Sequence, residues 1–143
     1  MKHDEATQGN SVSHSTTVQD YCSAWAQNNE RDIREALASC WTPASTYTDP
    51  VTPTVTGPEE LAAVILGLHT NFPGALLVQT SQLDGHHAVG RFAWQLKSPT
   101  RIDPDGTARA LDVDGLDYVE FSEDGSRILR IVGFFGPLRA PET

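Results

Sequence analysis

The chain has 143 residues, of which 38% are hydrophobic, and its formal net charge is −9 at pH 7. This length fits one folded domain with a proper core, and the hydrophobic content excludes a disordered chain. The negative charge excludes a nucleic-acid partner, because phosphate binding needs clustered Lys and Arg, and no apolar run is long enough to span a membrane.

The N-terminal part predicts a leader followed by two helices. Residues 1–15 are polar and show no periodicity, so we expect a flexible leader in front of a domain that covers residues 16–143. Residues 18–25 and 33–41 each repeat apolar side chains at the spacing of one helix face, which predicts a helix in both stretches.

Two cysteines, Cys22 and Cys40, fall on apolar positions of these helices. Two are too few for a disulfide framework or a metal site, and free cysteines are commonly buried. The first residues lack the apolar segment of a signal peptide, and no nucleotide-binding loop or metal-ligand cluster is evident. We therefore predict core thiols in a protein of the reducing cytoplasm, with no metal and no cofactor.

The middle of the chain predicts a strand and a third helix. The strand covers residues 45–49, and a Pro-Glu-Glu run at 58–60 marks the first turn of a helix that extends to residue 72. Alternation places Tyr47 and Asp49 on one face of the strand. A buried charge is costly without a partner or a function, so we interpret Asp49 as lining a cavity.

The second half predicts four strands. They cover residues 76–82, 87–97, 110–122 and 128–135, and residues 99–107 form a loop. Three helices can cover only one face of such a sheet. We therefore expect an α+β fold of order ααβαββββ, in which a curved mixed or antiparallel sheet holds three helices on its concave face and forms an open cone.

Apolar residues also fall on the face that we expect the helices to leave free. Phe92, Trp94 and Leu96 alternate along one strand, and we place them on the outer side of the sheet. A monomer rarely exposes so large an apolar patch. We therefore predict a two-fold homodimer that pairs the outer sheet faces.

Two stretches carry a family resemblance. TYTDPV…TGPEEL is typical of the first strand and third helix of the nuclear-transport-factor-2-like superfamily, and GLDYVEFSEDGSRILRIVGFFGPL is typical of its last hairpin. This superfamily has a cystatin-like fold and includes the SnoaL-like polyketide cyclases and the ketosteroid isomerases. The resemblance covers residues 17–138. Because the superfamily hosts isomerases, cyclases, epoxide hydrolases and non-enzymes, the fold leaves the function open.

The resemblance to the ketosteroid isomerase branch implies three catalytic residues. The base of that branch is an Asp before Pro-Val at the end of a strand, which Asp49 matches. Its oxyanion donors are a Tyr on the first helix and a protonated Asp on the third meander strand, which Tyr21 and Asp117 match. The base takes a proton from carbon beside a carbonyl, and the donors stabilise the enolate oxygen. A neutral Asp117 needs an apolar site, and Phe121 shares its strand face.

Arg91 points to a different branch. Counting along the hairpin puts it beside Asp117, where its charge would keep that carboxyl ionised and unable to donate a proton. An Arg–Asp pair on neighbouring strands resembles the limonene epoxide hydrolase branch, which also needs an Asp two residues after the Arg. Ala93 stands there instead. Arg91 is therefore predicted either to pair with Asp117 or to bind the substrate.

Structural interpretations stay open for the same residues. Asp49 fits a turn cap, Tyr21 fits a core aromatic whose hydroxyl meets a backbone carbonyl, and Asp117 with Arg91 fits an ion pair that only orders the sheet. The candidates for contacts with the substrate are Arg91, Tyr47, Trp25, His69 and Phe121.

Two classes of function fit this pattern. One is a small enzyme for cofactor-free proton transfer, of isomerase or cyclase type, on a small apolar carbonyl compound; it needs Asp49 in an open cavity without a cation partner. The other is a non-catalytic module for ligand binding or dimerisation, in which Asp49 is held by backbone hydrogen bonds or the cavity is filled. An epoxide hydrolase-like enzyme is a further alternative.

Overall fold

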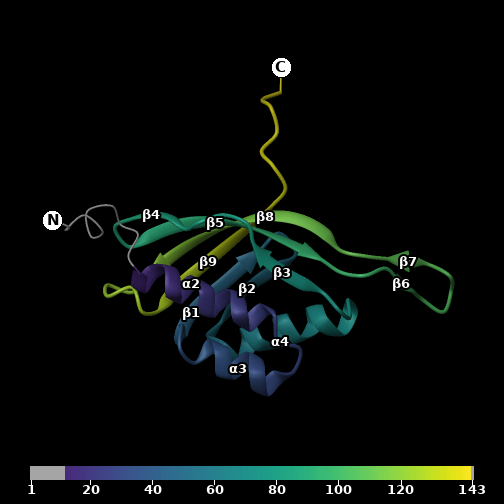
Figure 1. The fold of residues 1–143 in the computed structure, drawn as a ribbon, viewed down its shortest axis with the longest axis horizontal. Coiled ribbons are helices and arrows are strands. Elements are labelled where there is room, and N and C mark those ends of the chain that lie inside the picture. Colours follow the sequence, from purple (N-terminus) through teal and green to yellow (C-terminus); the bar gives the residue numbers. More distant parts are fainter. Residues whose placement is uncertain (1–11, 143) are drawn as a thin grey trace.

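The computed structural model describes residues 12–142, and it shows three helices on the concave face of an open, mixed sheet (Figure 1). The helices are α2 (Val12–Trp25), α3 (Glu30–Leu37) and α4 (Gly57–Asn71). The strands are β1 (Trp41–Asp49), β2 (Thr52–Thr56), β3 (Leu76–Gln79), β4 (Asp84–His86), β5 (Val89–Lys97), β6 (Arg101–Ile102), β7 (Ala108–Arg109), β8 (Asp112–Phe121) and β9 (Ile128–Phe135).

Seven strands form the main sheet. Their order is β2-β1-β9-β8-β5-β3, and β4 also pairs with β5. β1 runs parallel to β9, and the other pairs are antiparallel. The predicted α+β architecture is confirmed. Two parts of it were missed: the stretch after Asp49 forms the edge strand β2, and the expected loop at 99–107 carries the small ribbon β6–β7.

The core lies between the helices and the sheet. Side chains such as Val18, Ile33 and Ile65 are fully buried from the helix side, and they meet Val119 and Ile131 from the sheet side. Each helix therefore contributes one apolar stripe, as the 3.6-residue spacing predicts. None of the described helices is long and apolar enough to cross a membrane.

The side-chain alternation of β5 is opposite to the prediction. Phe92 pairs with Asp117 in register, and both side chains are buried on the helix side of the sheet, as is Trp94. Arg91 lies opposite Tyr118 and faces outward. The placement of Phe92, Trp94 and Leu96 on the outer face is therefore wrong. Because strand side chains alternate, a one-residue difference in register reverses every side chain.

The predicted leader is too long at its C-terminal end. Residues 12–15 belong to α2 rather than to a flexible segment. The His14 ring stacks on Phe121 with centroids 4.5 Å apart, and Ser13 Oγ donates a hydrogen bond to the Asp124 carbonyl at 3.4 Å. The rest of the predicted leader, residues 1–11, lies outside the described residues.

We expect a chain that starts at Thr16 to unfold more easily than one that starts at Val12. The shorter chain loses the first turn of α2 together with the contacts of Ser13 and His14. An aromatic contact and a hydrogen bond of this kind contribute about 1–2 kcal/mol together. Urea denaturation of the two chains measures the difference, and equal midpoints would show that these contacts contribute nothing.

Candidate functional site

A cavity of about 470 Å³ opens between the sheet and helices α2 and α4. Its walls are mainly apolar, and Asp49 and Asp117 are the acidic side chains that line it. Among the described residues that line this cavity, none is Lys, Arg or His. Aromatic walls come from Tyr21, Trp25, Tyr47, Phe72, Phe92, Trp94 and Phe135.

Gly133 lies next to the side chains of both acids. It lies opposite Asp117 in the pairing of β8 with β9. A Cβ atom at position 133 would lie 3.0 Å from Oδ1 of Asp117 and 3.3 Å from Cβ of Asp49. The two acids therefore share the space that a side chain at Gly133 would fill.

Asp117 is the more deeply buried of the two acids. Only 6% of the residue is exposed, and Nε1 of Trp94 donates a hydrogen bond to Oδ1 at 2.9 Å. Burial raises the pKa of Asp117 to about 7; the charge of Asp49 adds to this rise and the Trp94 hydrogen bond opposes it. At neutral pH a large fraction of Asp117 is therefore protonated and able to donate a hydrogen bond.

Gly115 provides the space that Trp94 occupies. The two residues face each other across β5 and β8, and a Cβ atom at position 115 would overlap the indole ring. The absence of a side chain at Gly115 thus allows the indole N–H to reach Asp117.

Gly115→Ala should lower the free energy of unfolding by about 1–3 kcal/mol, because a methyl group there forces the rigid indole out of its position. The matched control is Gly67→Ala in α4, where a Cβ atom meets nothing within 4 Å. Alanine favours a helix interior over glycine, so this change should stabilise the protein by up to about 1 kcal/mol. Thermal denaturation compares the two variants, and shifts of the same sign would contradict this account.

Asp49 is held by two neighbours. The Tyr47 hydroxyl donates a hydrogen bond to Oδ2, and the backbone N–H of Val51 donates to Oδ1 at 2.9 Å. The second bond confirms the turn-cap interpretation. Burial, followed by the charge of Asp49, raises the pKa of Tyr47, so this hydroxyl keeps its proton and remains a donor. Asp49 is half-buried at the cavity wall and keeps free lone pairs on its oxygens.

Tyr21 lines the cavity from α2. The residue is only 2% exposed, and its ring stacks on Trp41 with centroids 5.7 Å apart. Its hydroxyl makes no hydrogen bond of ordinary geometry within the described part of the chain. Burial, and then the charge of Asp117, raises the pKa of Tyr21, so the hydroxyl is a protonated donor without an acceptor. A buried hydroxyl of this kind is available to a ligand oxygen.

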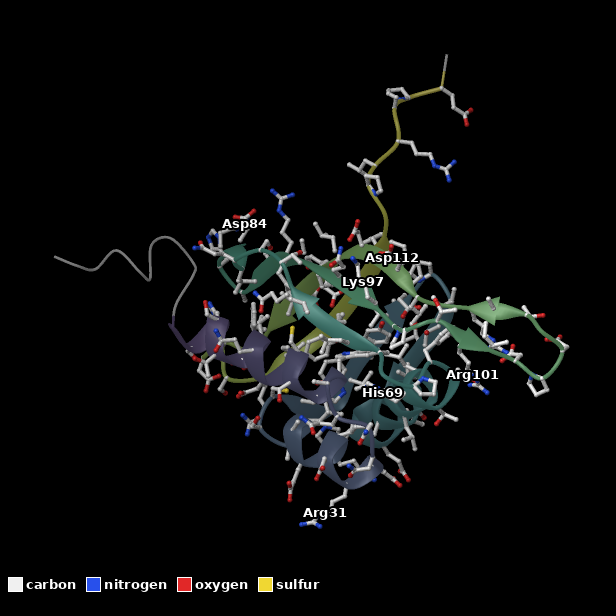
Figure 2. The ribbon with its side chains drawn as sticks, turned by 45° about the vertical axis from the view of Figure 1, so that its right-hand side comes forward. Arg31, His69, Asp84, Lys97, Arg101 and Asp112 are labelled. Carbon is white, nitrogen blue, oxygen red and sulfur yellow. The ribbon has the colours of Figure 1, made fainter. Side chains whose placement is uncertain are left out.

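Arg91 does not face the cavity, which corrects the prediction that it pairs with Asp117 or with a substrate. Its Nε donates to Oδ2 of Asp84 at 2.8 Å, and both side chains are exposed. Figure 2 shows Asp84 at the sheet edge, away from the helices. The register difference described above accounts for the error.

Two further candidates lie away from the cavity wall. The ring of His69 is hydrogen-bonded through Nε2 to the Trp25 carbonyl at 2.8 Å, so it joins α4 to α2 (Figure 2 labels it on α4). Phe121 is buried against His14. Trp25 and Tyr47 line the cavity as predicted.

Cys22 differs from the predicted core thiol. It is half-buried and lines the cavity, whereas Cys40 is buried as expected. Burial raises the pKa of Cys22 to about 12, so its thiol keeps its proton at neutral pH. Trp94 and Gly133 were not predicted at this site, because both contact the acids from neighbouring strands.

Residues 18–131 match the family model of the SnoaL-like domain. The chain belongs to the SnoaL-like family. This membership confirms the resemblance to the nuclear-transport-factor-2-like superfamily. No protein of curated function matches the chain.

Three solved structures are similar to this chain. A proposed isomerase of the family from Agrobacterium tumefaciens is 31% identical, with a TM-score of 0.70 over 89% of this chain and 100% of that one. A proposed SnoaL-like polyketide cyclase from Jannaschia is 17% identical, with a TM-score of 0.68 over 87% and 85%. A Catenulispora acidiphila protein with a ketosteroid isomerase-like fold, in complex with trimethylamine, is 15% identical, with a TM-score of 0.66 over 84% and 85%. The last two show the fold alone.

Proposed function

We propose that this SnoaL-like protein performs cofactor-free proton transfer, of isomerase or cyclase type, on a small apolar carbonyl compound. The observation that carries the proposal is the pair Asp49 and Asp117, which both lie next to Gly133 and line one cavity with mainly apolar walls. Their surroundings differ, and a difference of this kind separates the base from the acid.

Asp49 is the proposed base. Its carboxylate takes the proton from carbon beside the carbonyl; the C–H bond breaks and its electron pair moves to the carbonyl oxygen, which becomes an enolate. Tyr21 and protonated Asp117 donate hydrogen bonds to that oxygen. Asp49 then returns the proton to another carbon of the conjugated system, so the reaction is balanced without a co-reactant.

The placement of Arg91 supports the role of Asp117. A cation beside this carboxyl would keep it ionised, but Arg91 pairs with Asp84 on the outer face. The same placement removes the basis of the epoxide hydrolase alternative, which requires an Arg–Asp pair in the cavity.

The proposal is tested with small β,γ-unsaturated ketones, from 3-cyclohexenone to a ketosteroid, in deuterated buffer. Proton transfer converts them to conjugated ketones, which absorb in the ultraviolet, and exchanges deuterium into the carbon beside the carbonyl. A phenol of matching size mimics the enolate and should bind in the cavity. The proposal would be overturned if no ketone of the series were converted and none took up deuterium.

A non-catalytic ligand-binding module is the second candidate. It is favoured by the hydrogen bonds from Tyr47 and Val51, which occupy one lone pair on each oxygen of Asp49. The Catenulispora acidiphila protein in complex with trimethylamine has the same fold. This candidate predicts ligand binding in the cavity without deuterium exchange.

We further propose a homodimer through the outer sheet face, on different residues from those first expected. Leu116 lies between Ala93 and Phe134 in register there, and Phe134 is 53% exposed. Light scattering should give a dimer at micromolar concentration, and Phe134→Asp should shift it to the monomer. A wild-type monomer would contradict this proposal.

A cytoplasmic location also remains a proposal. Cys22 and Cys40 are both free in the structure, which fits a reducing compartment. Fractionation of the cells that make the protein would test it.

A further inference from the structure

The cavity holds the negative charge of Asp49 without a cation among the described residues of its wall, and Asp117, which is in large part protonated at neutral pH, adds less charge. Asp49 and Asp117 line it, and no Lys, Arg or His belongs to the described part of its wall. The Tyr21 hydroxyl is buried, lines the same space and has no hydrogen bond of ordinary geometry within residues 12–142. These groups are arranged for a ligand that supplies both an acceptor oxygen and positive charge.

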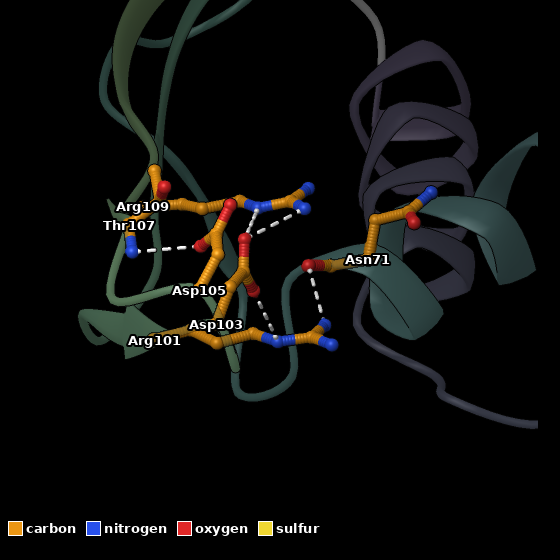
Figure 3. A network of polar contacts seen from close by, with 6 residues as sticks. All are labelled: Asn71, Arg101, Asp103, Asp105, Thr107 and Arg109. Carbon is orange, nitrogen blue, oxygen red and sulfur yellow. Dashed lines mark hydrogen bonds and ion pairs between the residues drawn. The ribbon is translucent and has the colours of Figure 1, made fainter.

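The basic side chain next to the cavity mouth is already paired. Arg101 Nη1 donates to the carbonyl of Asn71 at 3.2 Å, and Asn71 belongs to the cavity wall. Arg101 and Arg109 both pair with Asp103, at 3.4 and 2.9 Å, and Asp105 lies beside them (Figure 3). These two cations and two anions make this part of the cavity rim close to neutral, so it does not offset the negative charge of Asp49 inside.

Aromatic rings surround the same space. Trp25 and Tyr47 lie with ring centroids 5.5 Å apart, and Trp94 meets Phe135 edge to face at 6.0 Å. The face of an aromatic ring attracts a cation, most strongly where water is excluded. Rings and carboxylates together suit an organic ammonium group better than a hydrocarbon of the same shape.

We propose that the ligand of this cavity is an organic cation, an amine or quaternary ammonium compound that also carries a carbonyl group, with its ammonium group against Trp25 and Tyr47 and close to Asp49. This replaces the apolar carbonyl compound of the proposed function by a cationic one. The carbonyl group rests on the proposed function, whereas the positive charge rests only on the residues that line the cavity. The net charge of −9 also attracts cations to the protein before they bind.

The cation affects binding more than chemistry. When a proton moves from carbon to Asp49, the carboxylate loses its charge and the enolate oxygen gains one, so the total charge in the cavity does not change. The ammonium group therefore stabilises the substrate complex and the enolate to a similar degree. Such uniform binding lowers KM and leaves kcat nearly unchanged.

Three probes of one shape test the charge preference: choline, its neutral carbon analogue 3,3-dimethylbutan-1-ol, and the anion 3,3-dimethylbutanoate. None of them has a ketone or a phenol, so binding needs no catalysis. Binding is followed by calorimetry and by the fluorescence of Trp25 and Trp94, which line the cavity. Choline should bind about tenfold or more tightly than the neutral probe, and the anion most weakly.

Asp49→Asn should remove most of the preference for choline, because the amide keeps the shape of the side chain without its charge. The matched control is Asp84→Asn, which removes one carboxylate from the outer face, where Asp84 pairs with Arg91. This control should keep the full preference. A preference that falls equally in both variants would reflect net charge alone and would overturn the proposal.

Equal or tighter binding of the neutral probe would also overturn it, as would no binding of any probe up to its solubility limit. The outcome is independent of the ketone assays. If choline binds but no ketone exchanges deuterium, the cation site stands and the proposed enzyme activity falls. If neutral ketones exchange deuterium but the probes show no charge preference, the enzyme activity stands and the cation site falls.

Discussion

Asp49→Asn is expected to lower the turnover of a carbonyl substrate by about 10²- to 10⁴-fold, because an amide cannot accept the proton that leaves carbon. The affinity for a neutral phenol should change little, since Asn keeps the shape of the side chain and an oxygen for the N–H of Val51. The measurement is the rate of deuterium exchange into the ketone under saturating conditions.

Two exposed residues provide controls for this experiment. Asp84→Asn and Arg91→Ala each break the ion pair on the outer sheet face and leave the cavity wall intact. Both variants should exchange deuterium at the wild-type rate. Activity that survives in Asp49→Asn would remove this residue from the mechanism, and a loss of activity in Arg91→Ala would contradict its placement on the outer face.

The second large effect concerns how stability depends on pH. The pKa of Asp117 is about 7 in the folded protein and 3.8 in its unperturbed state, and burial is the main cause of the rise. The folded protein therefore keeps a proton that the unfolded chain releases. The stabilising contribution of this proton is complete below pH 3.8 and is lost as the pH rises to about 7. The loss is on the order of 4 kcal/mol.

Asp117→Asn makes this contribution visible, because an amide does not titrate. The free energy of unfolding of the variant, minus that of the wild type, should rise by about 4 kcal/mol from the acid side of this range to the neutral side. Urea denaturation at a series of pH values measures it. Asp124→Asn is the control: the hydrogen bond from the Ser126 backbone lowers the pKa of Asp124 to about 2, so its effect changes with the opposite sign and only between about pH 2 and 3.8, and it should stay constant from there to neutral pH. A difference that stays constant with pH would show that Asp117 is ionised in the folded state.

The fold was largely predictable from local patterns. The helical spacing of apolar residues and the Asp-Gly turns predicted three helices and the strands of the meander, and the two family-like stretches predicted the curved sheet. The side-chain alternation of β5 was not predictable. It depends on the register in which β5 pairs with β8, where Phe92 rather than Arg91 lies opposite Asp117. That register places Phe92 in the cavity wall and Arg91 on the outer face.

The candidate site was predictable only in part. The family motifs indicated Asp49, Tyr21 and Asp117, and the structure places all three at one cavity. Trp94 and Gly133 escaped prediction because their effect on the acids depends on which residues lie opposite each other in the sheet. The spacing of residues along the chain does not determine such contacts between strands.

The base of the β6–β7 ribbon is closed by two hydrogen bonds: the N–H of Ser98 donates to the Leu111 carbonyl at 3.0 Å, and the N–H of Leu111 donates to Ser98 Oγ at 2.8 Å. Leu111 belongs to the cavity wall, whereas the tip of the ribbon projects beyond the sheet (Figure 1). Changes of length at the tip are thus separated from the strands that hold the acids. We therefore expect insertions or deletions at the tip of this hairpin to change the surface beside the cavity mouth without moving Asp49 or Asp117.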